Sequence, residues 1–368
     1  MKNKINYMLN SILKEDLKNI NNSLYNRDLF KNSIILVTGC AGFLGYYFIN
    51  YFLKYSKELE IKKVIGLDTF LLDNADWLSE LAKVFPETLI LKSFDISKDD
   101  ISKLEDINKV NYVVHAASIA SPSFYRKFPL ETIDANIWGL RNLVDFFNSK
   151  KNLLKGFLFF SSSEIYGDPD EDSIPTNEEY RGLVSCHGPR ACYDESKRFG
   201  ETICWVYGKK YDIPITVVRP FNNYGPGMRL NDKRLPADFA SCILKQRDIV
   251  ILSDGSPTRT FCYISDAMTG YLMALLHGKY DYFNIGNEKP EISVKDFALL
   301  FKKAGQDVLN YQGEVIYSES KDVEYMIDNP NRRCPQIIKA KKILGYSPKV
   351  TLEKGVKRYL EYLKINTL

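Results

Sequence analysis

The stretch SIILVTGCAGFLG, residues 33–45, runs an apolar strand into a glycine-rich turn that opens a helix. Glycines at 39, 42 and 45 (Gly39, Gly42 and Gly45) let the backbone come close to a pyrophosphate, whose charge the helix N-terminus attracts. Phe43 and Leu44 lie between the last two glycines and belong to the same turn. The segment therefore predicts a dinucleotide-binding loop.

An aspartate lies at the position from which a dinucleotide-binding fold contacts the adenosine ribose. Asp68 ends the next apolar strand, 23 residues after Gly45 (68 − 45). A carboxylate at this place accepts hydrogen bonds from an adenosine ribose and repels a 2′-phosphate, which favours NAD over NADP. Asp95 ends the following strand and could meet the adenine amine, although a turn role is the ordinary alternative for a lone aspartate.

Strand and helix patterns alternate over residues 33–220, and this alternation predicts an α/β fold with a doubly wound parallel sheet of the Rossmann type. The expected strands are 33–39, 62–68, 88–95, 111–118, 155–163 and 214–220, and the expected helices are 43–55, 132–149 and 190–211. Residues 221–368 are more broken and read mainly as a smaller substrate-binding lobe, partly interleaved because 258–278 is expected to return to the first domain. Residues 1–32 form an extension, with helical apolar spacing over 5–24.

Composition excludes several classes of function. Of the 368 residues 45% are apolar and 26% charged, and the net charge of +4 gives no footprint of nucleic-acid binding. The seven cysteines form no C-x-x-C pair and the three histidines are isolated, so we expect reduced thiols, a cytoplasmic protein and no metal site. No apolar run reaches membrane-spanning length and the N-terminus has no signal-peptide core, so no membrane partner is expected.

Tyr193 and Lys197 lie one helical turn apart, on the same face of the expected helix 190–211. A nearby cation lowers the pKa of a tyrosine toward neutrality, so a phenolate could take a proton from a substrate hydroxyl while a nicotinamide takes the hydride. Ser162 and Glu164 end a strand, where open α/β sheets place their ligands. Ser162 could share a hydrogen bond with Tyr193, and Glu164 could act as a base, although capping and solvation are the common roles of such residues.

Several motifs together give the chain a resemblance to a known family. They are GCAGFLG, HAAS, SSSEIYGDP, GPRACYDESKR, RPFNNYGPGM, GSPTRTFCYISD and the C-terminal NRRCP and KAKKILGYSPKVTLEKGVKRYLEY. Over residues 33–365 the chain resembles the extended short-chain dehydrogenase/reductase family of nucleotide-sugar enzymes, and most of all its decarboxylases of nucleotide-linked uronic acids. The resemblance implies bound NAD, a nucleotide-sugar substrate with UDP-linked sugars first, and a homodimer formed through a four-helix bundle.

The resemblance also implies roles for individual residues. Tyr193 would deprotonate the sugar 4-hydroxyl, Lys197 would tune it and hold the nicotinamide ribose, and Ser162 would orient the substrate. Ser163 and Glu164 would lie beside C5 and its carboxylate. The remaining positions implied are Ala117 of the HAAS motif for the cofactor, Arg333 for the sugar carboxylate, Arg259 for phosphate, Asn222 for the diphosphate and sugar, and Arg234 for the substrate.

Ser163 discriminates between reactions within this family. The 4,6-dehydratases carry an aspartic acid there, because expelling the C6 hydroxyl needs a proton donor. We therefore expect decarboxylation of UDP-glucuronate to UDP-xylose by C4 oxidation, loss of CO₂ and re-reduction. A 4-epimerase, a 4,6-dehydratase and a catalytically dead NAD-binding interaction module remain the alternatives. Departures from the family pattern are Ser162 for Thr, Cys40 in the loop, Leu252, Gln336 and the N-terminal extension.

Overall fold

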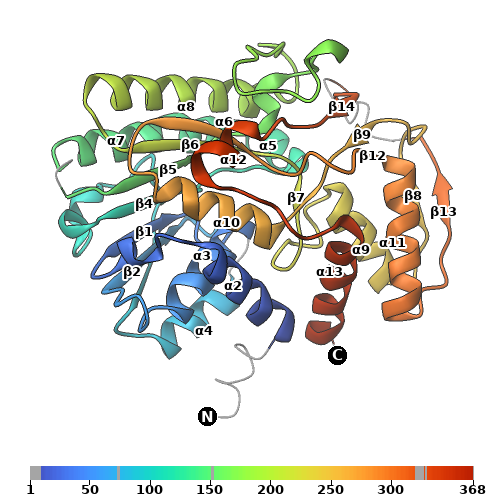
Figure 1. Ribbon diagram of the computed structural model, residues 1–368, viewed down its shortest axis with the longest axis horizontal. Helices are drawn as coiled ribbons and strands as arrows, with labels where there is room; N and C mark the ends of the chain where they lie inside the picture. Colours follow the sequence, from blue (N-terminus) through green and yellow to red (C-terminus); the bar gives the residue numbers. More distant parts are fainter. Residues whose placement is uncertain (1–9, 73–74, 151–152, 320–326, 328–329, 368) are drawn as a thin grey trace.

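The computed structural model describes residues 10–72, 75–150, 153–319, 327 and 330–367, and a seven-stranded parallel sheet forms its centre (Figure 1). The strand order is β3-β2-β1-β4-β5-β6-β11. The strands are β1 Ile34–Thr38, β2 Lys63–Asp68, β3 Leu89–Ser93, β4 Tyr112–His115, β5 Gly156–Phe160, β6 Ile215–Pro220 and β11 Asp281–Ile285. The prediction of a doubly wound, Rossmann-type parallel sheet is confirmed.

Helices cover both faces of this sheet, which explains why β1 and β5 are buried along their whole length. One face of the sheet carries α6 Pro129–Ile133, α7 Leu140–Asn148 and α8 Ala191–Lys210, with the short α5 Pro122–Lys127 at its end (Figure 1). The other face carries α3 Phe43–Lys54, α4 Asp76–Val84 and α10 Ile264–Leu275. The strand order reverses between β1 and β4. The carboxyl ends of the strands at such a switch point form the crevice in which open α/β sheets bind ligands.

The helix expected over 132–149 is interrupted by a π-helical turn, η5 Asp134–Gly139, which joins α6 to α7. Gly139 ends this turn where a β-carbon would lie 2.5 Å from Cγ2 of Ile96. The bulge is compatible with close packing of this helix on the sheet. Short 3₁₀ segments elsewhere are η2 Arg27–Phe30, η3 Ile101–Lys103, η4 Ile107–Lys109, η6 Ser163–Tyr166 and η7 Glu171–Ser173.

The second lobe contains three small sheets. Their strands are β7 Asn223–Tyr224 with β10 Cys262–Tyr263, β8 Ile249–Ile251 with β13 Val315–Tyr317, and β12 Ile292–Ser293, β9 Thr258–Arg259 and β14 Arg332–Arg333. Its helices are α9 Leu235–Leu244, α11 Val294–Leu309, α12 Ile338–Leu344 and α13 Leu352–Thr367. The chain returns from this lobe to the large sheet, because β11 pairs with β6.

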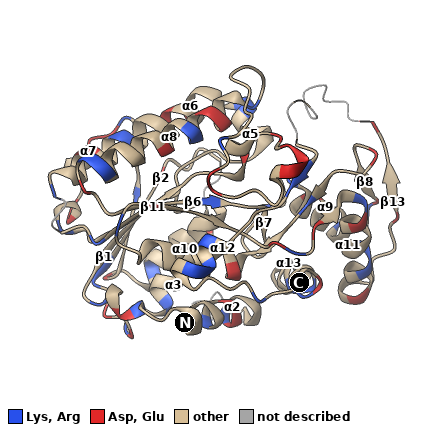
Figure 2. Cartoon of the chain, turned by 45° about the horizontal axis from the view of Figure 1, so that its top comes forward, with Lys and Arg blue, Asp and Glu red and all other residues tan. Residues whose placement is uncertain are grey.

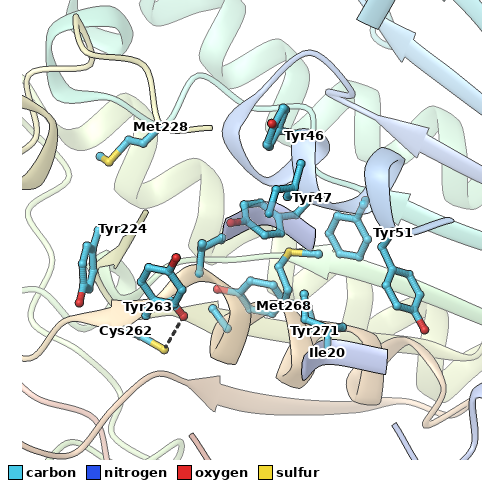
Figure 3. Close-up of a cluster of buried hydrophobic side chains, with 14 of the residues drawn as sticks. Ile20, Tyr46, Tyr47, Tyr51, Tyr224, Met228, Cys262, Tyr263, Met268 and Tyr271 are labelled. Carbon is cyan, nitrogen blue, oxygen red and sulfur yellow. Dashed lines mark hydrogen bonds between the residues drawn. The ribbon is translucent and has the colours of Figure 1, made fainter. Parts of the chain in front are cut away.

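The N-terminal helix α2 spans Ser11–Ser23, and the first part of the expected helix 5–24 lies outside the described residues. Asn10 caps it, because its Oδ1 accepts from the backbone N–H of Ile12 at 3.0 Å and of Leu13 at 3.2 Å. Ile20 of α2 joins the same buried cluster as Tyr47 of α3 and Met268 of α10 (Figure 3). The helix is therefore packed on its own chain. Within the described ranges no helix is long and apolar enough to cross a membrane.

Asp16 fastens α2 to the rest of the molecule although it is only 1% exposed. Its carboxylate accepts hydrogen bonds from the hydroxyls of Tyr47 at 2.8 Å and Tyr263 at 2.9 Å, and from Nη2 of Arg358 at 2.6 Å. These partners belong to α3, β10 and α13. A single buried carboxylate therefore joins the extension to both parts of the chain.

We expect Asp16→Ala to lower the free energy of unfolding by about 3–5 kcal/mol, because it leaves the Arg358 guanidinium without its buried carboxylate. Glu15→Ala is the matched control, since Glu15 also contacts Arg358, at 2.7 Å, but is 49% exposed. That control should cost at most about 1 kcal/mol. Urea denaturation of both variants makes the measurement, and equal losses would show that Asp16 has no special role.

Candidate active site

Two glycines of the turn after β1 lie where no side chain would fit. Gly39 has φ +70°, and a β-carbon there would lie 2.6 Å from the carbonyl oxygen of Ala116; one at Gly45 would lie 2.4 Å from that of Cys40. Gly42 is the N-cap of α3 and brings no side chain to that helix end. The first backbone N–H groups of α3 therefore face the crevice, in the arrangement that holds a pyrophosphate.

Asp68 ends β2 directly beside this turn. One carboxylate oxygen accepts from the backbone N–H of Ala41 at 3.0 Å and the other from that of Phe70 at 2.9 Å. Burial raises the pKa of Asp68 above its ordinary value. A carboxylate has about four acceptor sites, so Asp68 keeps acceptor capacity for a ribose hydroxyl, and the position fits the expected role.

Ala117 and Asp95, the two other residues expected to contact the cofactor, have different surroundings. Ala117 lies against the turn, because a β-carbon on Gly39 would be 2.7 Å from its nitrogen. Asp95 accepts hydrogen bonds from the backbone N–H of Ser97 at 3.0 Å and its hydroxyl at 2.6 Å, and pairs with Lys98 at 3.1 Å. These contacts are those of a turn aspartate.

Tyr193 and Lys197 lie on one face of α8, as their spacing predicted. Tyr193 is 6% exposed, and its ring stacks on that of Tyr125 with centroids 5.1 Å apart. The Nζ of Lys197 donates to the carbonyl of Phe160 at 2.7 Å and lies 5.7 Å from the centroid of the Tyr193 ring. The pair is thus held where β5 ends.

The protonation of this pair differs from the expectation of a tyrosine with a pKa near neutrality. Burial raises the pKa of Tyr193 to about 12, and a hydrogen bond with Ser162 only partly opposes that effect. Burial also lowers the pKa of Lys197 to about 7. The low-polarity surroundings disfavour both charged forms at once, which the spacing of the two residues cannot reveal.

Glu164 lies in η6, whose N-cap Ser162 accepts through Oγ from the backbone N–H of Glu164 at 3.2 Å. The carboxylate of Glu164 accepts from Nη2 of Arg333 at 3.1 Å and makes a second, shorter contact with Arg190. Burial alone would raise the pKa of this carboxyl, but the neighbouring arginines outweigh it and lower the pKa to about 2. Glu164 is therefore ionised at neutral pH and carries no proton to donate, while the expected part of a base stays a prediction.

Arg333 is 2% exposed and belongs to β14. Within the part of the chain that the structure describes, its Nε and Nη1 have no hydrogen-bond partner. Buried donors without a partner are costly, so this guanidinium is suited to an anion.

The other expected ligand contacts surround the same place. Arg259 lies opposite Arg333 in the small sheet and donates to the carbonyl oxygens of Asn331 at 3.0 Å and Pro330 at 2.5 Å. Asn222 donates to the carbonyl of Thr260 at 2.8 Å. A hydrogen bond with Ser162 and the charge of Arg234 act to lower the pKa of Tyr193. The charges of Arg259 and Arg333 lower the pKa of Glu164.

Three residues of the site were not foreseen from the sequence. Arg190 contacts Glu164, Asp194 lies 3.5 Å from Nε of Arg190, and Tyr125 stacks on Tyr193. The Arg190–Asp194 spacing of four residues within GPRACYDESKR was an available signal, because oppositely charged side chains at that spacing meet on a helix. Nothing in the local sequence pointed to Tyr125. In the described ranges no cluster of His, Cys, Asp or Glu could hold a metal.

A dinucleotide-binding turn and a buried tyrosine–lysine pair define an NAD-dependent enzyme, and the arginines around Glu164 suit an anionic substrate. The chain belongs to the NAD dependent epimerase/dehydratase family, whose model matches residues 35–286. It is thus an NAD-dependent enzyme that modifies nucleotide sugars.

Two similar proteins and one similar solved structure are described for particular nucleotide sugars. UDP-glucuronic acid decarboxylase 1 of Xenopus tropicalis is 34% identical over 333 residues, which cover 90% of this chain and 72% of that protein. UDP-glucuronic acid decarboxylase 6 of Arabidopsis thaliana is 33% identical over 339 residues, 90% of each chain. A solved structure of UDP-glucuronic acid 4-epimerase from Bacillus cereus, in complex with UDP-glucuronic acid and NAD, is similar with TM-score 0.73 and 27% identity, covering 90% of this chain and 99% of that one.

We expect Tyr193→Phe to lower turnover roughly a hundredfold or more, the scale of losing a general base, while NAD still binds. Tyr207→Phe is the control, because Tyr207 lies on the same helix but its hydroxyl donates to Asp145. Turnover of nucleotide sugar and NAD binding by fluorescence are the two readouts. Near-normal turnover of Tyr193→Phe would remove Tyr193 from the reaction.

Proposed function

We propose that this protein decarboxylates a nucleotide-linked uronic acid, UDP-glucuronate first, to the corresponding pentose. The observation that carries the proposal is the buried guanidinium of Arg333, two of whose N–H-bearing nitrogens have no partner among the described residues. An arginine so placed suits a substrate carboxylate. The relatives named UDP-glucuronic acid decarboxylase support the same reading.

Several groups of the chain would bind and orient the reactants. The turn after β1 and the N-terminus of α3 would hold the pyrophosphate of NAD, and Asp68 its adenosine ribose. Bound NAD supplies the hydride acceptor and later the hydride donor. Tyr193, in its phenolate form, would take the proton of the sugar 4-hydroxyl, and Ser162 would orient that hydroxyl through its hydrogen bond with Tyr193.

The positive charge around Glu164 favours an acidic substrate. Arg190, Arg259 and Arg333 surround Glu164, and with Asp194 also counted the cluster remains positive, with three cations against two carboxyl groups. Such a cluster of charges suits a diphosphate and a sugar carboxylate. Once C4 is a ketone the carboxylate lies β to it, and loss of CO₂ then needs mainly a stabilised enolate and a proton. Ser163 offers no acid for the competing dehydration.

A 4-epimerase is the second candidate. The similar structure of a UDP-glucuronic acid 4-epimerase favours it, because that enzyme binds the same uronic acid. Incubating the protein with NAD and a panel of UDP-, GDP-, CDP- and dTDP-sugars, with the products separated by chromatography and their masses read out, separates the two. Loss of CO₂ from a uronate supports the decarboxylase, and turnover without change of mass supports the epimerase.

We expect Arg333→Ala to abolish CO₂ release from UDP-glucuronate while free UDP still binds nearly as well as in the wild type. Arg332→Ala is the matched control, because Arg332 is the neighbouring residue of β14, is 38% exposed and pairs with Glu291 at 2.8 Å. It should leave CO₂ release unchanged. If UDP binding falls in parallel with CO₂ release, Arg333 is a phosphate ligand instead.

We also propose that the protein is a homodimer. Large apolar side chains are exposed on α8 and the neighbouring η5, namely Phe199 at 53%, Trp205 at 55% and Trp138 at 57%. Ile203 and Tyr207 of the same helix face the core instead. An apolar helical face of this kind suits a symmetric interface between two copies.

The double variant Phe199→Glu with Trp205→Glu should be monomeric by light scattering at micromolar concentration, whereas the wild type should be a dimer. Leu299→Glu is the control, because Leu299 is 45% exposed on α11, in the second lobe. A monomeric wild type, or a dimeric double variant, would refute this interface.

A further inference from the structure

Asp194 is a buried carboxyl group beside the reacting tyrosine, and the reaction proposed above leaves it without a task. It is 6% exposed and follows Tyr193 in α8. Its Oδ2 lies 3.5 Å from Nε of Arg190, and its Oδ1 has no hydrogen-bond partner in the described chain. A buried carboxylate that is ionised normally has closer partners than these.

Asp194 and Glu164 share one arginine unequally. Arg190 contacts Glu164 closely through Nη2, and Arg333 adds a second contact to Glu164 at 3.1 Å, so Asp194 has only the longer contact with Arg190. Where two carboxyl groups lie in one cluster and one of them is better paired, the other holds the proton. The geometry therefore places the ionised member at Glu164 and the protonated member at Asp194.

The surroundings of Asp194 agree with this assignment. Burial and the charge of Glu164 raise the pKa of Asp194 to about 7, although Arg190 and Arg333 act to lower it. Tyr125 faces the same cluster from α5, and its hydroxyl likewise has no partner in the described residues. The groups that act on Asp194 thus come from η6, α8, β14 and α5.

The chemistry requires a proton that neither other candidate supplies. When CO₂ leaves, the C5–C6 bond breaks and its electron pair forms the C4–C5 double bond of an enolate, with negative charge on O4. C5 must then gain a proton. Glu164 is ionised, and the proton on Tyr193 is needed on O4 when the ketone is reduced.

We propose that Asp194 stores this proton and delivers it to C5, directly or through one water. The C5–H bond forms, the C4 carbonyl is restored, and Asp194 is left as a carboxylate that regains a proton from solvent. The inference rests on the proposed decarboxylation. It replaces Glu164, which serves instead as a fixed negative charge between two arginines.

Asp194→Asn tests the proposal, because the amide keeps the size of the side chain but has no acidic proton. In a single turnover with UDP-glucuronate, CO₂ should appear at near wild-type rate while UDP-xylose forms roughly tenfold or more slowly, because the enolate must take a proton from solvent before C4 can be reduced. In D₂O the wild type should place deuterium at C5 in one configuration, and the variant in both. Glu195→Gln is the control, because Glu195 is 40% exposed and pairs with Arg198.

A second measurement needs no turnover. The infrared difference spectrum of wild type minus Asp194→Asn should contain a protonated-carboxyl band at pH 6 that disappears as the pH rises through about 7, because burial and Glu164 raise the pKa of Asp194 to about 7. The subtraction removes the band of Asp16, whose pKa burial raises to about 6. The inference is overturned if that band is missing, if Asp194→Asn forms UDP-xylose normally, or if the variant loses CO₂ release and UDP-xylose in parallel. A wild type that releases no CO₂ from any nucleotide-linked uronate refutes the proposed function itself, and the inference with it.

Discussion

The ion pair of Glu164 with Arg190 and Arg333 is the interaction on which the site depends. It joins η6 at the end of β5, the turn that enters α8, and β14 of the second lobe. Removing one partner of a buried ion pair is strongly destabilising, so these two contacts favour one relative position of the three elements. The two arginines that pair with Glu164 also give its surroundings a net positive charge.

Burial then decides where the protons of the site are held. It raises the pKa of Tyr193 to about 12 and lowers that of Lys197 to about 7, so at neutral pH the phenol is protonated and the ammonium is about half deprotonated. Among the carboxyl groups, two arginines keep Glu164 ionised while Asp194 is left with weaker contacts. One environment thus separates two chemically similar side chains into a fixed anion and a proton carrier.

The N-terminal extension is connected to this site only at a distance. Asp16 ties α2 to Tyr263 of β10 and to Arg358 of α13, and β10 follows closely on Arg259. The extension therefore connects α3 with β10 and α13 through one buried carboxylate. Its amphipathic pattern was visible in the sequence, but the charged residue buried within its apolar face was not.

The sequence by itself determined what depends on near neighbours in the chain. Glycine spacing gave the turn after β1, the position of Asp68 gave NAD, alternating patterns gave the parallel sheet, and a spacing of four brought Tyr193 and Lys197 to one helix face. Only the tertiary structure decided the rest. It joined Glu164 to Arg333, 169 residues apart, and to Arg190, 26 residues apart. Burial and charge act through space, so the protonation of Tyr193, Lys197, Glu164 and Asp194 follows from what the fold packs around them and from no local pattern.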